Sequence, residues 1–171
     1  MTAEADTLIC NTGPLIAIAA GTGSWEVLQC LPLQIIIPSA VRLELEAGRP
    51  HAPGSNVLSH SPWIHIASDV PAIPAYLEAT LDPGEAAVIA TALAMRVSTV
   101  AIDERNARHV ARCCGLRLTG SLGLLIKAIR HGAPINLSDA INQMRAAGVW
   151  ISDSLAAEAL RLAQIQSDGL T

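Results

Sequence analysis

Four side chains with oxygen donors stand where a parallel α/β sheet would bring them together. Asn11 and Asp103 each follow an apolar, strand-like run. Glu85 lies in the first turn of the helix expected to lead into the strand before Asp103, and Glu44 lies one turn inside an earlier helix. Converging carboxylates repel unless a cation joins them, and oxygen ligands in an open site suit Mg²⁺ or Mn²⁺. Such an ion lowers the pKa of water and clamps a phosphodiester in line, so the sequence points to metal-dependent hydrolysis.

Each of these residues also has a purely structural interpretation. Asp82 and Glu85 have the spacing of a capping box at a helix start. Asn11 or Asp103 could cap the helix that follows it, and Glu44 could be a solvated helix residue. The spacing by itself does not choose between capping and metal binding.

The elements that must position these side chains alternate along the chain. Apolar and β-branched runs predict strands at 7–10, 34–37, 63–67, 98–102 and 117–118. Helix starts at Pro, Ser or Asp and stops at Gly predict helices at 15–20, 24–30, 38–48, 75–80, 86–96, 104–114, 120–131, 137–147 and 152–165, with a loop at 51–61. This alternation predicts an α/β fold with a central, mainly parallel sheet covered on both faces. Sites in such sheets form at the carboxyl edge of the strands.

Composition limits the class of protein. The chain has 171 residues, of which 51% are hydrophobic and 15% charged, so one folded domain is expected rather than disorder. No apolar run reaches the roughly 18 residues of a membrane span, and residues 1–7 carry no Lys or Arg as a secretory signal would. The four cysteines form no C-x-x-C pair. We therefore expect reduced thiols, a cytoplasmic location and no membrane partner.

Positive charge is concentrated in one part of an acidic chain. The net charge is −4, yet most of the 11 basic residues lie between 96 and 130. Arg105, Arg108 and Arg112 are spaced three and four apart, so they share a helix face that begins beside Asp103. We expect this face to bind RNA phosphates, with a solvated surface as the alternative. With no Phe, one Tyr and three Trp, we do not expect a base-stacking platform of RRM or cold-shock type.

Five segments, taken in order, resemble PIN-domain proteins: 9–16, 37–44, 81–86, 102–108 and 119–123. Within that family they are most similar to a prokaryotic group described as nucleic-acid-binding, and the tail at 144–148 and 151–153 is similar to the same group. The resemblance implies a three-layer α/β/α sandwich. We expect a PIN-like core at 1–133, with a C-terminal helical extension at 134–171 packed on the same domain.

The resemblance also implies a function. It predicts a Mg²⁺- or Mn²⁺-dependent endoribonuclease that acts on single-stranded RNA. Because many relatives are toxins of toxin–antitoxin pairs and work as dimers, an antitoxin protein and a second copy of the chain are expected partners.

Site residues carry over one by one. The acidic positions of the family's site are matched by Glu44, Glu85 and Asp103. Asn11 matches the first acidic position, which is usually Asp, so the expected metal ligands are Glu85, Asp103 and Asn11, with Glu44 completing the catalytic set. Thr119 or Ser121 matches a polar position that helps bind metal or water, and we assign both to the RNA-binding surface.

Asn11 is where the chain departs from the family's pattern. An amide oxygen can still ligate a cation or hold a water, but it brings no charge. Weaker metal binding or slower cleavage is the expected consequence. The alternative function is therefore a catalytically weakened PIN-like module that binds nucleic acid or a protein partner.

Overall fold

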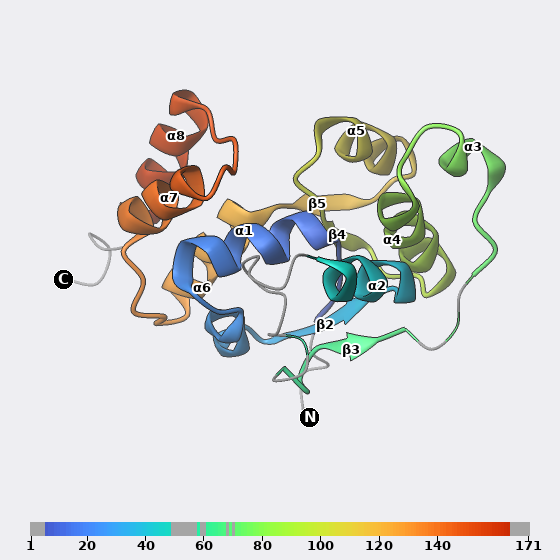
Figure 1. The fold of residues 1–171 in the computed structure, drawn as a ribbon, viewed down its shortest axis with the longest axis horizontal. Helices are drawn as coiled ribbons and strands as arrows, with labels where there is room; N and C mark the ends of the chain where they lie inside the picture. Colours follow the sequence, from blue (N-terminus) through green and yellow to red (C-terminus); the bar gives the residue numbers. More distant parts are fainter. Residues whose placement is uncertain (1–5, 49–57, 59–60, 68, 70, 165–171) are drawn as a thin grey trace.

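A parallel sheet of five strands forms the centre of the fold. The computed structural model describes residues 6–48, 58, 61–67, 69 and 71–164 (Figure 1). The strands are β1 (Asp6–Cys10), β2 (Leu33–Ile37), β3 (His65–Ile66), β4 (Thr99–Ala101) and β5 (Arg117–Thr119). Their order is β3-β2-β1-β4-β5, and every pair is parallel. The expected α/β fold is confirmed, and the sheet is wholly rather than mainly parallel.

The register of the central strands decides which residues meet at the carboxyl edge. Cys10 at the end of β1 pairs with Ala101 at the end of β4. The next residue, Asn11, donates its backbone N–H to the Ala101 carbonyl at 3.0 Å. Ala101 pairs in turn with Thr119 at the end of β5. Three strands therefore end level with one another, and the residues after them share one edge.

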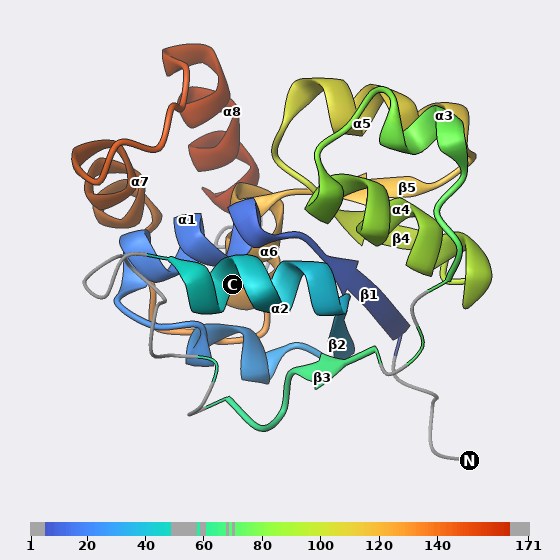
Figure 2. The same ribbon diagram turned by 45° about the vertical axis from the view of Figure 1, so that its right-hand side comes forward.

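Helices cover both faces of this sheet. They are α1 (Thr12–Thr22), α2 (Ser39–Ala47), α3 (Ala75–Glu78), α4 (Pro83–Ala94), α5 (Arg105–Cys113), α6 (Ser121–Arg130), α7 (Leu137–Ala146) and α8 (Asp153–Gln164), with a 3₁₀ helix η1 (Glu26–Cys30). α4 packs on β1 and β4, whereas α1 packs with α6 and α7. Figure 2 shows α4 and α5 on one side of the strands and α1 and α6 on the other. The C-terminal pair docks on the core, with α7 against α1 and α8 against α6.

The core explains why the strands and α4 are apolar throughout. The second half of β1 and of β2 is buried, as expected for strands covered on both faces. α4 is buried over the whole stretch 84–92, because it lies between the sheet and neighbouring helices. Its buried acid, Glu85, is therefore held in a largely apolar helix whose other buried polar residue is Thr91.

Most element boundaries differ from the expected ones by one to three residues. α1 begins at Thr12 rather than 15, because the first-turn N–H groups of a helix have no internal partner and Pro14 is tolerated there. The strand expected at 63–67 shrinks to His65–Ile66, since Ile64 N–H bonds back to the Ser61 carbonyl in a turn. The segment expected as a helix from 24 is a 3₁₀ helix from Glu26. The loop expected at 51–61 falls mostly outside the described residues.

Over the described parts of the chain, no helix is both long and apolar enough to cross a membrane.

Candidate metal centre

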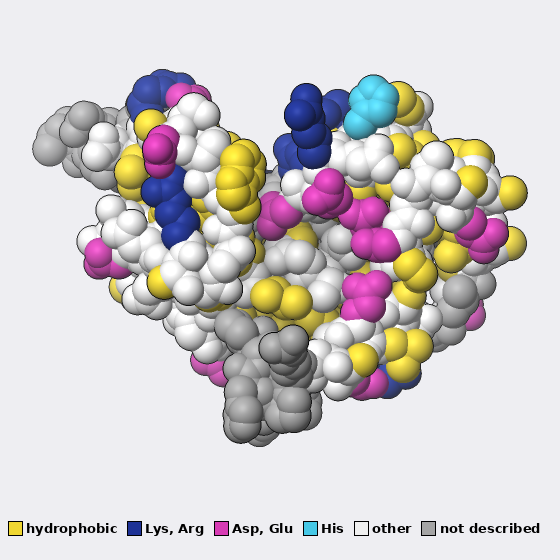
Figure 3. Space-filling model, turned by 45° about the horizontal axis from the view of Figure 1, so that its top comes forward, with side chains coloured by type: hydrophobic (Ala, Val, Ile, Leu, Met, Phe, Trp, Pro, Cys, Tyr) yellow, Lys and Arg dark blue, Asp and Glu magenta, His cyan; other side chains and the backbone are white. Residues whose placement is uncertain are grey.

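A hollow with an acidic floor opens at the carboxyl edge of the sheet. Figure 3 shows acidic side chains gathered in this hollow, with basic side chains on one rim. The ends of β1, β4 and β5 lead into the starts of α1, α5 and α6 here. Helix N-termini carry partial positive charge, so several of them together favour anionic side chains and anionic ligands.

Asn11 occupies the N-cap position of α1 but does not act as a cap. Its backbone is extended (φ −85°, ψ 167°), and its side chain makes no capping hydrogen bond. The residue is 7% exposed, and its Oδ1 has no hydrogen-bond partner among the described protein atoms. Leaving a buried polar atom unmet costs about 1–3 kcal/mol. The capping interpretation is therefore wrong for Asn11, and this oxygen is available to a ligand.

Glu44 reaches from α2 toward two helix starts. Its carboxylate accepts a hydrogen bond from the Thr12 hydroxyl in the first turn of α1. It also lies against Gly84 in the first turn of α4, so closely that a Cβ at position 84 would overlap it. Glu44 is exposed, yet it is held by specific contacts. The absence of a side chain at Gly84 is what lets this carboxylate approach α4.

Glu85 forms the expected capping box and is also buried at the start of α4. The capping box is present: Asp82 Oδ1 accepts from Glu85 N–H at 2.8 Å, and Glu85 Oε2 accepts from Asp82 N–H at 3.3 Å. The residue is only 5% exposed. Burial is the main cause that raises the pKa of its carboxyl, and the charges of Asp82, Glu104 and Glu44 raise it further, against the lowering effect of the Asp82 N–H. A cation beside Glu85 would relieve this concentration of negative charge.

Asp103 follows β4 and turns toward α6. Its Oδ1 accepts from the Ser121 N–H at 2.9 Å, while the N-cap position of α5 belongs to Glu104. The interpretation of Asp103 as a cap for α5 is therefore wrong. Loss of hydration raises the pKa of the Asp103 carboxyl, and hydrogen bonding from Ser121 and the nearby Arg108 charge partly offset the rise. A Cβ on Gly120 would overlap this carboxylate, so Gly120 makes its position possible.

The three carboxylates line one edge, but each has its own partner. Glu44 is held by Thr12, Glu85 by Asp82 and Asp103 by Ser121. In the described part of the chain, no three His, Cys, Asp or Glu side chains are close enough together to hold an ion as they stand. The donor set nevertheless fits a hard cation, because it consists of carboxylate oxygens and an unmet amide oxygen. Glu85, Asp103 and Asn11, with Glu44 beside them, are the residues that could hold one.

The three arginines expected to form one RNA-binding face have different surroundings. Arg108 is half-buried, and its Nη1 donates to the carbonyls of Ile102 at 2.6 Å and Thr119 at 2.9 Å. Burial, together with the charge of Arg112, lowers its pKa. Arg108 therefore braces the ends of β4 and β5, and the exposed arginines of this face are Arg105 and Arg112.

The remaining predicted polar residues lie at the start of α6. Ser121 is 5% exposed and lies in the first turn of this helix. Thr119 is half-buried, and a Cβ on Gly123 would come within 2.6 Å of its Oγ1. Both line a pocket of about 420 Å³ that also contains Asp103 and Arg108.

Sequence reasoning missed the aromatic residue of this pocket. Trp150, in the connection between α7 and α8, lines the same pocket and is 85% exposed. Its signal in the sequence is slight: a large aromatic residue in a short connection between two helices. Only the docking of α7 and α8 on the core brings it beside Asp103.

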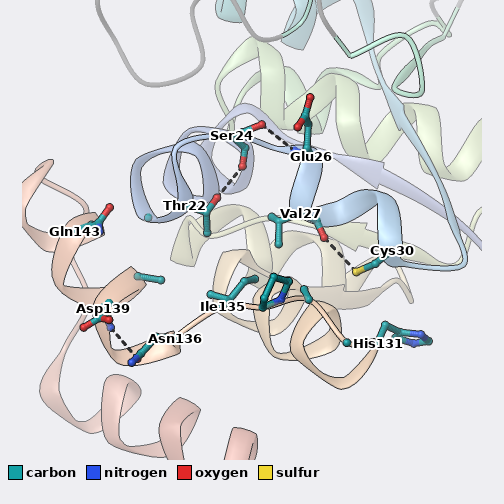
Figure 4. A pocket seen from close by; sticks show the side chains of 15 residues that line it. Thr22, Ser24, Glu26, Val27, Cys30, His131, Ile135, Asn136, Asp139 and Gln143 are labelled. Carbon is teal, nitrogen blue, oxygen red and sulfur yellow. Dashed lines mark hydrogen bonds between the residues drawn. The ribbon is translucent and has the colours of Figure 1, made fainter.

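A pocket larger than the one beside Asp103 lies elsewhere in the described structure. It measures about 690 Å³ and is formed by the end of α1, η1, the segment 131–136 and α7 (Figure 4). No predicted site residue lines it. Several of its polar groups serve local turns and caps: the Thr22 hydroxyl donates to the Ser24 carbonyl at 2.7 Å, and Asn136 Oδ1 accepts from Asp139 N–H at 3.2 Å. Its size therefore does not make it the better candidate.

Comparison with known proteins gives one family. A family model described as "DUF3368: PIN domain" matches residues 7–165. No match was found among curated proteins or among solved structures.

Proposed function

This chain belongs to the DUF3368 family of PIN domains, and from that premise we propose that it is a metal-dependent endoribonuclease that cuts single-stranded RNA. The PIN domain is a nuclease fold, so hydrolysis of a phosphodiester is the reaction class. The observation that carries the proposal is the unmet, buried Asn11 Oδ1 at the edge where Glu44, Glu85 and Asp103 also lie.

The proposal assigns the cation to these oxygens. Glu85, Asp103 and Asn11 would hold Mg²⁺ or Mn²⁺, with Glu44 beside them. When bound, such an ion activates water and neutralises charge that develops on the phosphodiester. Loss of hydration raises the pKa of both Glu85 and Asp103, so these carboxyls retain their protons more strongly than usual, and a cation would have to compete with those protons.

The other residues would position the RNA. Arg105 and Arg112 are exposed on α5 and can pair with phosphates of the strand. Arg108 keeps the ends of β4 and β5 in register through its two carbonyl contacts. Ser121 fixes Asp103 through its backbone N–H.

A cleavage assay tests the proposal directly. The purified chain should cut a fluorescently labelled single-stranded RNA with Mn²⁺ and not with EDTA, and Asp103→Asn should abolish the cutting. Asp139→Asn is a matched control, because this aspartate lies in the larger pocket. If wild type and Asp103→Asn show the same trace activity, the proposal is wrong. Calorimetric titration with Mn²⁺ gives a readout that does not depend on turnover.

A toxin role is part of the same proposal. It rests on the resemblance to PIN-domain toxins that work with an antitoxin and as homodimers. Expression of the wild-type chain should then stop bacterial growth, whereas expression of Asp103→Asn should not. Equal growth of the two cultures would refute the toxin role and would leave the nuclease assignment unaffected. Light scattering of the pure protein checks the expected dimer.

A second candidate function is a PIN-like module that binds but cuts poorly. Two observations favour it: an uncharged residue at position 11, and carboxylates that do not converge in the described residues. This module would bind RNA or a protein partner without measurable Mn²⁺-dependent cleavage. Binding of labelled RNA that persists while no product forms would support it over the enzyme.

A further inference from the structure

The three tryptophans of the chain have different surroundings. Trp25 is 0% exposed, and its Nε1 donates to the Leu15 carbonyl at 2.7 Å, so it belongs to the core. Trp63 is partly buried against the core. Trp150 is 85% exposed, more than any other large apolar residue described. Packing therefore explains two of them and leaves Trp150 without a role in the fold.

The connection that carries Trp150 is well fixed. Before it, the N–H groups of Gly148 and Val149 bond to the carbonyls of Arg145 and Met144, both at 3.0 Å. After it, Arg145 donates to the Ile151 carbonyl through Nε at 3.1 Å and Nη2 at 2.8 Å. The backbone on both sides of the indole is thus tied to α7. Because hydrogen bonds already hold this connection in place, the exposed ring can contact a ligand with little further loss of conformational entropy.

Trp150 forms part of the pocket that contains Asp103. One side of this 420 Å³ pocket comes from the α7–α8 region, with Trp150 and Leu155, and the other from the β5–α6 turn with Ser121. Arg108 lines the same pocket. The volume lies within the range of about 300–1,000 Å³ typical of small-molecule sites. An aromatic ring, a guanidinium, a hydroxyl and a candidate metal ligand therefore face one space.

This combination matches the parts of a nucleotide. A base offers a flat π face to an indole, whereas its phosphate is attracted to cations and helix starts. A purely apolar partner would cover the hydrogen-bonding groups of Asp103 and Arg108 that their existing partners, the Ser121 N–H and the strand-end carbonyls, do not use. The charge pattern therefore favours RNA over a protein surface.

We propose that Trp150 is a base-stacking residue, which binds the nucleobase next to the phosphate presented to Asp103. The position of that phosphate rests on the proposed nuclease function, whereas the stacking itself does not. Every base has a π face, so the site should accept any base with weak preference. Specificity would be for an unpaired strand, because a base in a duplex is not free to enter.

Binding of labelled RNA tests this without turnover. Fluorescence anisotropy with a fluorescein-labelled oligouridylate, measured in Ca²⁺, should show that Trp150→Ala weakens affinity about tenfold, as loss of one stacked base does. Trp150→Phe should retain most of the affinity. Tyr76→Ala is the matched control: Tyr76 is 53% exposed but lines a different pocket, so its loss should change nothing. All three variants should keep the wild-type melting temperature.

A strand that lacks one base locates the contact. When the position of an abasic nucleotide is moved along the oligonucleotide, wild type should lose affinity most at one position. Trp150→Ala should be insensitive at that same position, because the partner of the missing base is already gone. If the abasic nucleotide weakened binding to Trp150→Ala as much as it weakens binding to wild type, the two losses of affinity would be additive. That result would contradict stacking on Trp150.

The outcomes separate this proposal from the nuclease assignment. If wild type cuts RNA and Trp150→Ala has unchanged affinity and KM, stacking is refuted and the nuclease stands. If no cutting occurs but Trp150→Ala weakens RNA binding, stacking stands and the nuclease is refuted. If Trp150→Ala turns a dimer into a monomer in light scattering with RNA affinity per protomer unchanged, Trp150 is a protein interface and the proposal is overturned.

Discussion

Asn11 and Asn136 occupy the same position in two helices but use their side chains differently. Both are N-cap residues, of α1 and α7. Asn136 Oδ1 accepts from the Asp139 N–H at 3.2 Å, as a cap should. Asn11 Oδ1 is buried and accepts nothing from the described residues. The Asn136 oxygen therefore caps its own helix, whereas the Asn11 oxygen remains available to a ligand.

The same contrast holds for the regions around them. Asn136 lines the larger pocket, in which polar groups serve nearby turns and caps. Asn11 lies at the carboxyl edge, where the pKa of Glu85 and of Asp103 is raised. Buried polar atoms without a partner do not mark the site by themselves, because Ser61 Oγ and Trp63 Nε1 are two others in the described residues. At the carboxyl edge, however, the unmet Asn11 Oδ1 coincides with the raised pKa of Glu85 and of Asp103. This combination, rather than pocket volume, distinguishes the candidate site.

Among changes that leave every candidate ligand in place, the largest expected effect comes from filling the space beside Asp103. Gly120→Ala puts a Cβ into the Asp103 carboxylate, so Mn²⁺-dependent cleavage should fall roughly 10- to 100-fold, as when a metal ligand loses its support. Gly21→Ala is the counterpart in the larger pocket, where a Cβ would meet the Ala140 carbonyl at 3.0 Å. It should cost about 1–3 kcal/mol of unfolding free energy and leave Mn²⁺ affinity unchanged. Equal losses of activity in both variants would remove the distinction between the two regions.

Exchanging each asparagine for alanine tests the opening comparison. Asn11→Ala should weaken Mn²⁺ binding about tenfold, with little change in unfolding free energy in EDTA, because the described residues make no hydrogen bond to its Oδ1. Asn136→Ala should lower the unfolding free energy by about 1 kcal/mol and leave Mn²⁺ binding intact. Calorimetric titration and denaturant unfolding measure the two quantities. The reverse pattern would mean that Asn11 is structural after all.

A carboxylate at position 11 should strengthen metal binding at the site. Asn11→Asp adds a negative charge, so Mn²⁺ affinity should rise several-fold, by up to about tenfold or ~1.4 kcal/mol. In EDTA the same variant should melt at a lower temperature, since the new charge would be buried at the end of β1, beside the end of β4 that leads to Asp103. No change in the Mn²⁺ titration would argue against a site that lacks one charge.

The smallest expected effect is a pH dependence of stability. Burial and neighbouring acids raise the pKa of Glu85 in the folded protein, so its stabilising contribution is complete below the ordinary carboxyl pKa near 4.5. That contribution is lost as pH rises through the raised pKa, because the unfolded chain releases this proton first. In EDTA, the melting temperature of wild type should therefore fall by a few degrees more than that of Glu85→Gln between about pH 4 and pH 7. Parallel curves for the two proteins would contradict the raised pKa.

Local sequence patterns were enough to predict most elements of the fold. The capping box at Asp82 and Glu85 was predicted from spacing and is present. The buried strands at β1 and β2 were predicted from β-branched runs, since a strand covered on both faces must be apolar throughout. The predicted boundaries were wrong by a few residues at the ends of elements. Examples are the start of α1, where Pro14 lies in the first turn, and β3, which follows a turn.

The candidate site was predictable only in part. Strand ends and the family resemblance selected Asn11, Glu44, Glu85 and Asp103, and they all lie at or near the carboxyl edge. Spacing could not tell that Asp103 bonds to Ser121, 18 residues later, rather than capping its own helix. Nor could it separate Arg108, which braces two strand ends, from the exposed arginines of the same helix. These are contacts between distant segments, and their partners do not follow from local periodicity.

By itself, the sequence determined the alternation of strands and helices, the capping of α4 and the family, because these depend on neighbours along the chain. The tertiary structure alone decided which polar atoms remain unmet. Asn11 and Asn136 have the same local signal, yet the register of β1 against β4 buries Asn11 Oδ1 without a partner. The docking of α7 and α8 likewise leaves Trp150 exposed beside Asp103. Satisfaction of a polar group, or exposure of an apolar one, is a property of the three-dimensional surroundings and not of the residue or its neighbours in sequence.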